Sequence, residues 1–204
     1  NQILQENGMK TELYCPYVLG ARSDRRFKMT QSFDLKIVAD IINSCNFERV
    51  IVFDAHSDVL PALINRCINQ SAIAWIDKLS RLLWRNSILI SPDAGAYKKI
   101  FGLAEKLGCQ LVSGSKVRIP DGAPQVMIHG DVKDKNCVIV DDICDGGRTF
   151  IELGKLLKEQ GAKTVTLFVT HGIFSRGIQL ENIDAVYTTN SYQPFDETMQ
   201  TDYF

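Results

Sequence analysis

Two adjacent carboxylates that follow a short run of β-branched side chains are the residues best placed to do chemistry. Residues 138–140 predict a strand buried on both faces of a parallel sheet, which places Asp141 and Asp142 at its carboxyl end. Open α/β sheets bind ligands beyond that end of their strands. Carboxylates there can accept hydrogen bonds from sugar hydroxyls or bind a metal ion.

The residues that follow could hold a phosphate group. Gly146 and Gly147 allow a tight turn that brings backbone N–H groups close to an anion, and the amphipathic stretch 150–160 predicts a helix after it. The Thr149 hydroxyl can donate a further hydrogen bond, and Asp145 is expected near the reacting sugar. The alternative is a generic turn that happens to carry three aspartates.

This segment resembles the 5-phosphoribosyl-1-pyrophosphate (PRPP) binding motif of type I phosphoribosyltransferases and PRPP synthetases, a hydrophobic strand followed by Asp-Asp-x-x-Asp-Thr-Gly/Ala-Gly-Thr. It departs from the motif twice, because Gly146 replaces Thr and Arg148 replaces Gly. The arginine could add a charge-assisted phosphate contact, or its bulk could spoil the loop. The resemblance implies that ribose 5-phosphate is bound by Asp141, Asp142, Asp145, Gly146, Gly147, Arg148 and Thr149.

Further segments resemble PRPP synthetases in particular. The first three are similar to Pro-Tyr-x-x-x-Ala-Arg-Gln-Asp-Arg, Val-Asp-Leu-His and the pyrophosphate loop Ser-Pro-Asp-x-Gly-Gly, and two more match family landmarks in order. In chain order they are residues 16–26, 52–58, 91–95, 130–132 and 170–175. Ser23 replaces Gln in the first, and Ala96 replaces the second Gly of the third. Salvage phosphoribosyltransferases share only the ribose-phosphate motif.

A dense cationic segment follows the first predicted strand. Arg22, Arg25 and Arg26 lie within five residues and suit a nucleoside triphosphate, although they could also form a solvated turn paired with Asp24. His56 follows the apolar run 50–53, where a structural role is the alternative to metal or phosphate binding. The resemblance implies ATP binding by Arg22, Asp24, Arg25 and His56, a pyrophosphate loop of Asp93, Ala94 and Gly95, and Mg²⁺ binding by His56 and Asp93.

Glycine and proline are frequent in residues 114–124, which predicts a mobile loop and not packed structure. By resemblance, Lys116 and Arg118 are the catalytic cations of a loop that closes over polyphosphate. Without the neighbouring motifs, an ordinary charged surface loop would be the better interpretation.

Composition limits the possible functions. The 204 residues are 45% hydrophobic with a net charge of −1, so no basic excess indicates nucleic acid as a partner. No apolar run approaches the roughly 20 residues of a membrane span. The six cysteines lack Cys-x-x-Cys spacing, which favours reduced thiols and a cytoplasmic location.

Strands and helices are expected to alternate, which predicts an α/β fold with a mostly parallel, doubly wound sheet. Strands are expected near residues 11–15, 50–54, 87–91, 110–113, 125–129, 137–141, 164–170 and 184–188. Helices are expected near residues 33–45, 59–67, 74–84, 96–107 and 149–160. The resemblance implies two related domains of the type I phosphoribosyltransferase kind. These are a partial N-terminal domain, residues 1–70, and a C-terminal domain with the ribose-5-phosphate loop, residues 71–204.

The resemblance implies a Mg²⁺-dependent ribose-phosphate diphosphokinase, or the larger part of one, whose substrates are ATP and ribose 5-phosphate. Like the family, it is expected to form a homo-oligomer. Two alternatives stay open: a non-catalytic regulatory subunit, and a phosphoribosyltransferase that consumes PRPP.

Overall fold

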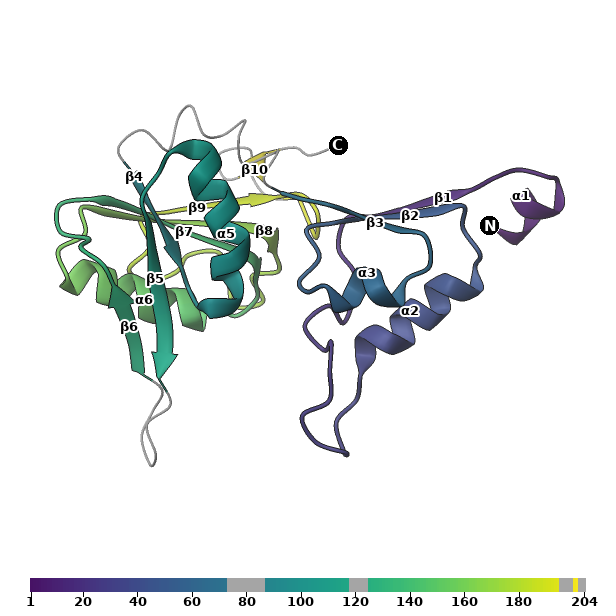
Figure 1. Cartoon of the computed structure of the whole chain (residues 1–204), viewed down its shortest axis with the longest axis horizontal. Helices are drawn as coiled ribbons and strands as arrows, with labels where there is room; N and C mark the ends of the chain where they lie inside the picture. The colour runs from purple at the N-terminus through teal and green to yellow at the C-terminus, as the bar shows by residue number, and fades with distance from the viewer. Residues whose placement is uncertain (73–86, 118–124, 195–199, 202–204) are drawn as a thin grey trace. The chain divides into compact units, whose positions relative to one another are not determined.

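The computed structural model describes residues 1–72, 87–117, 125–194 and 200–201. The chain divides into two compact units, residues 1–72 and 73–204, and each unit has its own sheet (Figure 1). The helix expected near residues 74–84 lies outside the described residues. Among the helices that are described, none is long and apolar enough to span a membrane.

The first unit is built on a three-stranded parallel sheet in the order β1-β2-β3. Its elements are α1 (Gln2–Glu6), β1 (Glu12–Cys15), α2 (Asp34–Ser44), β2 (Arg49–Phe53), α3 (Val59–Leu63) and β3 (Cys67–Gln70). Both crossovers run in the same direction along the sheet, so right-handed connections place α2 and α3 on one face, as Figure 1 shows. Residues 50–53 of the central strand are all buried.

The helix expected over residues 59–67 is wrong in its second half. Helix α3 ends at Leu63, and Arg66 has a left-handed backbone with φ of 55°. Its carbonyl accepts a hydrogen bond from the Val50 N–H (3.1 Å), which starts the pairing of β3 with β2. This edge strand has one β-branched side chain, Ile68, so little in its residues indicates a strand.

The second unit contains a seven-stranded sheet in the order β10-β9-β8-β7-β4-β5-β6, parallel except for the antiparallel pair β5 and β6. Its strands are β4 (Ser87–Ser91), β5 (Leu111–Val117), β6 (Gln125–His129), β7 (Asn136–Cys144), β8 (Thr164–Gly172), β9 (Ala185–Thr189) and β10 (Gln200–Thr201). Its described helices are α5 (Ala94–Leu107) and α6 (Arg148–Glu159). The expected α/β fold with mostly parallel sheets is confirmed.

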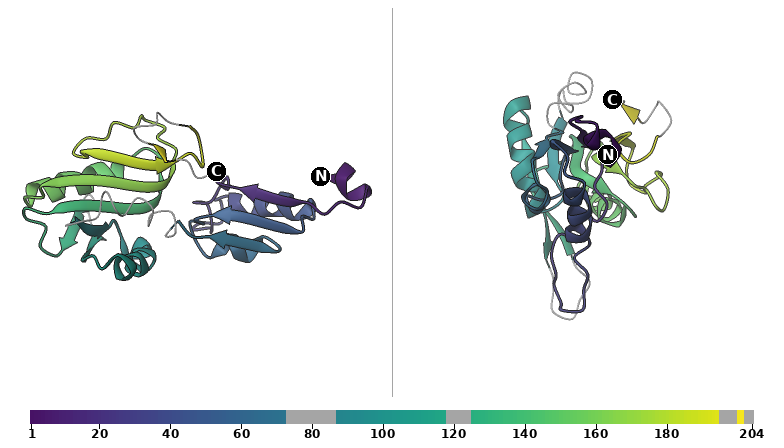
Figure 2. Two further views of the ribbon diagram at one scale, coloured as in Figure 1. Left: turned by 90° about the horizontal axis from the view of Figure 1, so that it is seen from above. Right: turned by 90° about the vertical axis from the view of Figure 1, so that its right-hand side faces the viewer.

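The order of the strands reverses between β4 and β7. Helix α5 leads from β4 to β5 on one side, whereas α6 leads from β7 to β8 on the other. Right-handed crossovers in opposite directions place these helices on opposite faces of the sheet, and Figure 2 shows α5 on its own face. Such a switch point is where ligands bind in doubly wound folds.

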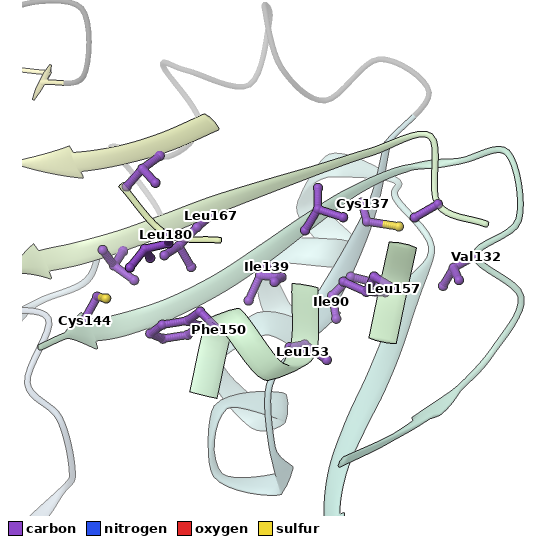
Figure 3. Packing of buried hydrophobic residues seen from close by; sticks show 14 of the residues in the cluster. Ile90, Val132, Cys137, Ile139, Cys144, Phe150, Leu153, Leu157, Leu167 and Leu180 are labelled. Atoms are coloured by element: carbon purple, nitrogen blue, oxygen red, sulfur yellow. The ribbon is translucent and has the colours of Figure 1, made fainter. Parts of the chain in front are cut away.

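Helix α6 fixes the predicted phosphate loop, residues 145–149, to the core of the second unit. Phe150, Leu153 and Leu157 recur at helical spacing and are almost fully buried against residues such as Ile139 and Leu167. Figure 3 shows these side chains packed between the helix and the strands. The start of α6 is therefore held in a fixed position relative to β7.

Two predicted boundaries in this unit are wrong. Strand β7, expected near residues 137–141, continues to Cys144 because Ile143 and Cys144 pair with β8, so the two adjacent carboxylates lie within the strand and not at its end. Residues 114–117, expected in a mobile loop, form the end of β5 and pair with β6. The remainder of that predicted loop, residues 118–124, lies outside the described residues.

Candidate functional site

The carboxyl ends of β4 and β7 are neighbours at the switch point. The strands pair in parallel, with Ile90 opposite Ile139. Asp93 lies two residues after the end of β4, and Asp141 and Asp142 occupy the last part of β7. The topology therefore brings together the carboxylates of two predicted motifs at the edge where this class of sheet binds ligands.

The two carboxylates of β7 concentrate negative charge. Burial raises the pKa of Asp141 well above its usual range, and the charges of Asp142 and Asp93 raise it further. The Asp142 N–H donates to Asp141 Oδ1 (2.9 Å), and the Asp142 side chain is only 7% exposed. Hydroxyl donors or a cation would relieve this repulsion, which suits sugar or metal binding.

Lys99 is a cation at this site that the sequence analysis missed. It lies on α5, and its Nζ is 4.0 Å from Asp142 Oδ2. Its sequence signal is weak, because Lys98 and Lys99 are adjacent on an exposed helix surface and only the tertiary fold selects the one that faces a carboxylate.

The loop after β7 contains two glycines, Gly146 and Gly147, that allow its backbone to pack closely against neighbouring side chains. Gly147 has φ of 73° and forms the N-cap of α6 without a side-chain cap. A Cβ atom on it would lie 2.5 Å from Leu180 Cδ2, so only glycine fits there without displacement. Within the described part of the chain, the N–H groups of Gly146 and Gly147 donate no hydrogen bond. They are thus suited to an anion at the start of α6.

Arg148, one of the two departures from the motif, does not disturb this helix start. It is the first residue of α6, and its Nε donates to Glu152 Oε1 one turn later (2.7 Å). Its side chain is 83% exposed. The first turn of α6 therefore accommodates Arg148, whose guanidinium is paired along the helix.

A second loop packs against the first. The N–H groups of Ile173 and Phe174 donate to the Cys144 carbonyl (2.8 and 3.2 Å), and Leu180 contacts the position of Gly147. Because β8 is the neighbour of β7, the predicted landmark over residues 170–175 lies beside the predicted phosphate loop. Arg176, in the same connection, was not identified from the sequence.

The predicted pyrophosphate loop, Asp93 to Gly95, forms the start of α5. Asp93 is the N-cap, and its Oδ1 accepts from the Ala96 N–H (2.9 Å). A Cβ atom on Gly114 would lie 2.9 Å from the Ser91 carbonyl oxygen, so a glycine on β5 permits close packing beneath this turn. The Asp93 carboxylate thus stabilises the helix start, whose first N–H groups have no intrahelical acceptor.

In the first unit, the predicted ATP-binding segments follow two adjacent parallel strands, β1 and β2, and so share one edge of the sheet. Asp24 is buried and accepts two hydrogen bonds from Arg25, at Oδ1 (2.7 Å) and Oδ2 (2.8 Å). The Ser57 hydroxyl faces this carboxylate without regular hydrogen-bond geometry.

The hydrogen bonds from Arg25 lower the pKa of Asp24 to about 2. Burial of the carboxylate opposes this shift, whereas Ser57 and the charges of Arg25 and His56 add to it. Asp24, Arg25 and His56 are therefore near one another, and Asp24 orients the guanidinium. Arg22 is exposed. The pairing of Arg25 with Asp24 agrees with the alternative interpretation of this turn as a solvated turn. The Arg25 side chain is also 59% exposed, so part of its guanidinium is accessible to an anion.

The residues present fit a Mg²⁺ ion only as partial ligands. No three His, Cys, Asp or Glu side chains cluster to hold a metal within the part of the chain that the structure describes. Asp141 and Asp142 offer hard oxygen donors in a site of excess negative charge, and Mg²⁺ commonly takes one or two carboxylates and completes its shell with water and substrate phosphates. The donor set agrees with a metal that arrives with a polyphosphate.

The predicted catalytic cations are only partly described. The backbone of Lys116 lies in β5, opposite Val126 of β6. Arg118 lies outside the described residues.

Comparisons with known proteins extend over both units. The family model of the phosphoribosyl transferase domain matches residues 64–201. The ribose-phosphate pyrophosphokinase of Aquifex aeolicus is 35% identical over 191 residues, 89% of this chain and 61% of that protein. Ribose-phosphate pyrophosphokinase 3 of Saccharomyces cerevisiae is 33% identical over 192 residues, 88% of this chain and 58% of that protein.

The crystal structure of phosphoribosylpyrophosphate synthetase from Mycobacterium smegmatis has the same fold, with a TM-score of 0.81 and 24% identity over 95% of this chain and 66% of that one. The chain thus spans about three fifths of the length of the curated relatives. It belongs to the phosphoribosyl transferase domain family, and over about nine tenths of its length it is related to the ribose-phosphate pyrophosphokinases.

Proposed function

We propose that this chain carries the activity of a ribose-phosphate diphosphokinase, or forms the larger part of a protein that does. The C1 hydroxyl of ribose 5-phosphate attacks the β-phosphorus of ATP, the diphosphoryl group is transferred, and AMP leaves. The observation that carries the proposal is the relationship to ribose-phosphate pyrophosphokinases over about nine tenths of the chain, with 35% identity to the Aquifex aeolicus protein.

The second unit supplies the sugar-phosphate residues in this proposal. Asp141 and Asp142 accept hydrogen bonds from the ribose hydroxyls, and the backbone of residues 145–149 binds the 5-phosphate. The orphan N–H groups at the start of α6 and the raised pKa of Asp141 support these roles. Fixing the sugar by both ends aligns its C1 hydroxyl, and alignment is a main task of a protein in this kind of transfer.

The remaining predicted residues are assigned to ATP. Arg22, Arg25 and His56 bind the nucleotide, and Asp24 holds Arg25 in position, which its two hydrogen bonds support. The turn at Asp93–Gly95 takes the diphosphoryl side, and Lys116 and Arg118 stabilise the charge of the transferring group. When bound, Mg²⁺ would neutralise phosphate charge beside the Asp141 and Asp142 carboxylates. The same proposal includes assembly into a homo-oligomer.

The test is AMP formation from ATP, Mg²⁺ and ribose 5-phosphate, measured by chromatography. AMP that depends on ribose 5-phosphate and disappears in Asp142→Asn would support the proposal. Release of pyrophosphate from PRPP only when a nucleobase is added would identify a phosphoribosyltransferase. Ribose 5-phosphate binding without AMP formation would favour a regulatory subunit. The departures from the family motifs at Ser23, Ala96, Gly146 and Arg148 agree with that alternative.

A further inference from the structure

Arg176 lies against the glycine turn of the phosphate loop. A Cβ atom on Gly146 would lie 3.6 Å from both Cδ and Nε of Arg176. The contact follows from the packing of two loops, because the Ile173 N–H donates to the Cys144 carbonyl (2.8 Å) just before the turn. The Arg176 side chain therefore reaches a segment distant in sequence.

The charge of Arg176 is not neutralised by the described residues. Its side chain is exposed, and none of the ion pairs within the described ranges includes it. Arg148 differs, since Glu152 binds its guanidinium (2.7 Å). Of these two arginines near the loop, Arg176 is the one that retains an unpaired positive charge among the described residues.

This charge adds to a surface that is already suited to an anion. Gly147 begins α6, a helix of 12 residues, and the N–H groups of Gly146 and Gly147 have no acceptor among the described residues. A helix start favours negative charge, and a guanidinium forms strong charge-assisted hydrogen bonds with phosphate oxygens.

We propose that Arg176 is a sugar-phosphate-binding residue whose guanidinium contacts the 5-phosphate of ribose 5-phosphate. The inference rests on the proposed function, because that function makes residues 145–149 the ribose-5-phosphate loop. It also explains the departure at Gly146. A Cβ atom at this position would already be in van der Waals contact with Arg176, so a branched threonine side chain would compete with Arg176 for the same space. In this proposal the guanidinium of the neighbouring loop takes the place of the missing threonine hydroxyl.

The test is isothermal titration of ribose 5-phosphate into the full chain and its variants. Arg176→Gln is expected to weaken binding by about tenfold or more, since it removes a charge-assisted hydrogen bond. Arg176→Lys keeps the charge but loses the planar guanidinium, so its affinity for ribose 5-phosphate is expected to lie between those of the wild type and Arg176→Gln. Lys155→Gln, which removes one charge from an exposed position in the middle of α6, should bind like the wild type. An unchanged free energy of unfolding of Arg176→Gln, measured in urea by hydrogen exchange of the β7 amides, would show that the second unit remains folded.

A double-mutant cycle tests the contact itself. Gly146→Thr should weaken ribose 5-phosphate binding by displacing Arg176, and it should do so less when Arg176→Gln is already present. Additive effects would overturn the inference, as would an Arg176→Gln variant that binds within twofold of the wild type. In both cases wild-type binding of ribose 5-phosphate would leave the proposed function standing. If the wild type does not bind ribose 5-phosphate, both proposals are contradicted.

Discussion

Gly147 should tolerate a methyl group much less well than a glycine with a similar backbone elsewhere in the same unit. Gly147 and Gly108 both lie at helix ends in the left-handed region, with φ of 73° and 63°. They differ in their surroundings. A Cβ atom on Gly147 would lie 2.5 Å from Leu180 Cδ2, whereas one on Gly108 would meet nothing within 4 Å.

The loss of unfolding free energy is set by the left-handed backbone and by the surroundings of the added Cβ atom. The left-handed backbone costs a non-glycine residue roughly 1–2 kcal/mol, of which alanine recovers about 0.4–1 kcal/mol through the lower entropy of its unfolded chain. Gly108→Ala should therefore destabilise by about 1 kcal/mol. Gly147→Ala adds the displacement of Leu180, which is 8% exposed, and overpacking of this kind costs roughly 1–3 kcal/mol. Its total should be about 2–4 kcal/mol.

The assay is urea unfolding, followed by circular dichroism and by hydrogen exchange of the β7 amides, which report on the second unit. Leu180→Ala should remove the extra cost, so that Gly147→Ala in that background costs about as much as Gly108→Ala. Equal losses of unfolding free energy for Gly147→Ala and Gly108→Ala in the wild-type background would contradict this prediction, because the close approach of Leu180 would then have no energetic effect.

Three further predictions concern charge and packing. Asp24→Asn should destabilise the protein by about 1–2 kcal/mol at pH 7, because the pKa of Asp24, lowered to about 2, stabilises the fold above about pH 4. The exposure of its partner Arg25 to solvent reduces this stabilisation. The difference in unfolding free energy between the wild type and the variant, measured in urea, should shrink as the pH falls from about 4 towards 2. Asp141→Asn should abolish AMP formation yet raise the free energy of unfolding at pH 7, because the raised pKa of Asp141 makes its ionisation in the folded protein costly above the pKa of the unfolded chain. This gain in stability should disappear as the pH drops below about 4, and a gain that persists there would argue against the cause. Gly114→Ala should disturb the turn after β4, since its Cβ would lie 2.9 Å from the Ser91 carbonyl oxygen. The variant should lose more of its AMP formation, measured by chromatography, than of its ribose 5-phosphate affinity, measured by calorimetry.

Local sequence signals predicted the core of the second unit well. The β-branched residues 138–140 form part of β7, and the helix expected at 149–160 is α6, shifted by one residue. The apolar stripe that ends at Gly108 is α5, which stops at a left-handed glycine as the pattern indicates. These elements were predictable because their hydrophobic period reflects burial.

Pairing between distant segments was not predictable in the same way. The extension of β7 to Cys144 depends on its partner residues in β8, and β3 is an exposed edge strand with little hydrophobic signal. Lys99 and Arg176 reach the candidate site through tertiary packing, and no local pattern separates them from ordinary surface cations. The sequence motifs predicted the loops of the candidate site, whereas the fold identified which neighbouring side chains lie next to them.

The most direct measurement follows the phosphates of ATP. The chain is incubated with Mg²⁺, ribose 5-phosphate and ATP labelled with ³²P at the γ-position, and the products are separated by chromatography. We expect label in a diphosphorylated ribose 5-phosphate, with unlabelled AMP formed in equal amount. Formation of ADP with a singly phosphorylated sugar, or no transfer although ribose 5-phosphate binds, would contradict it.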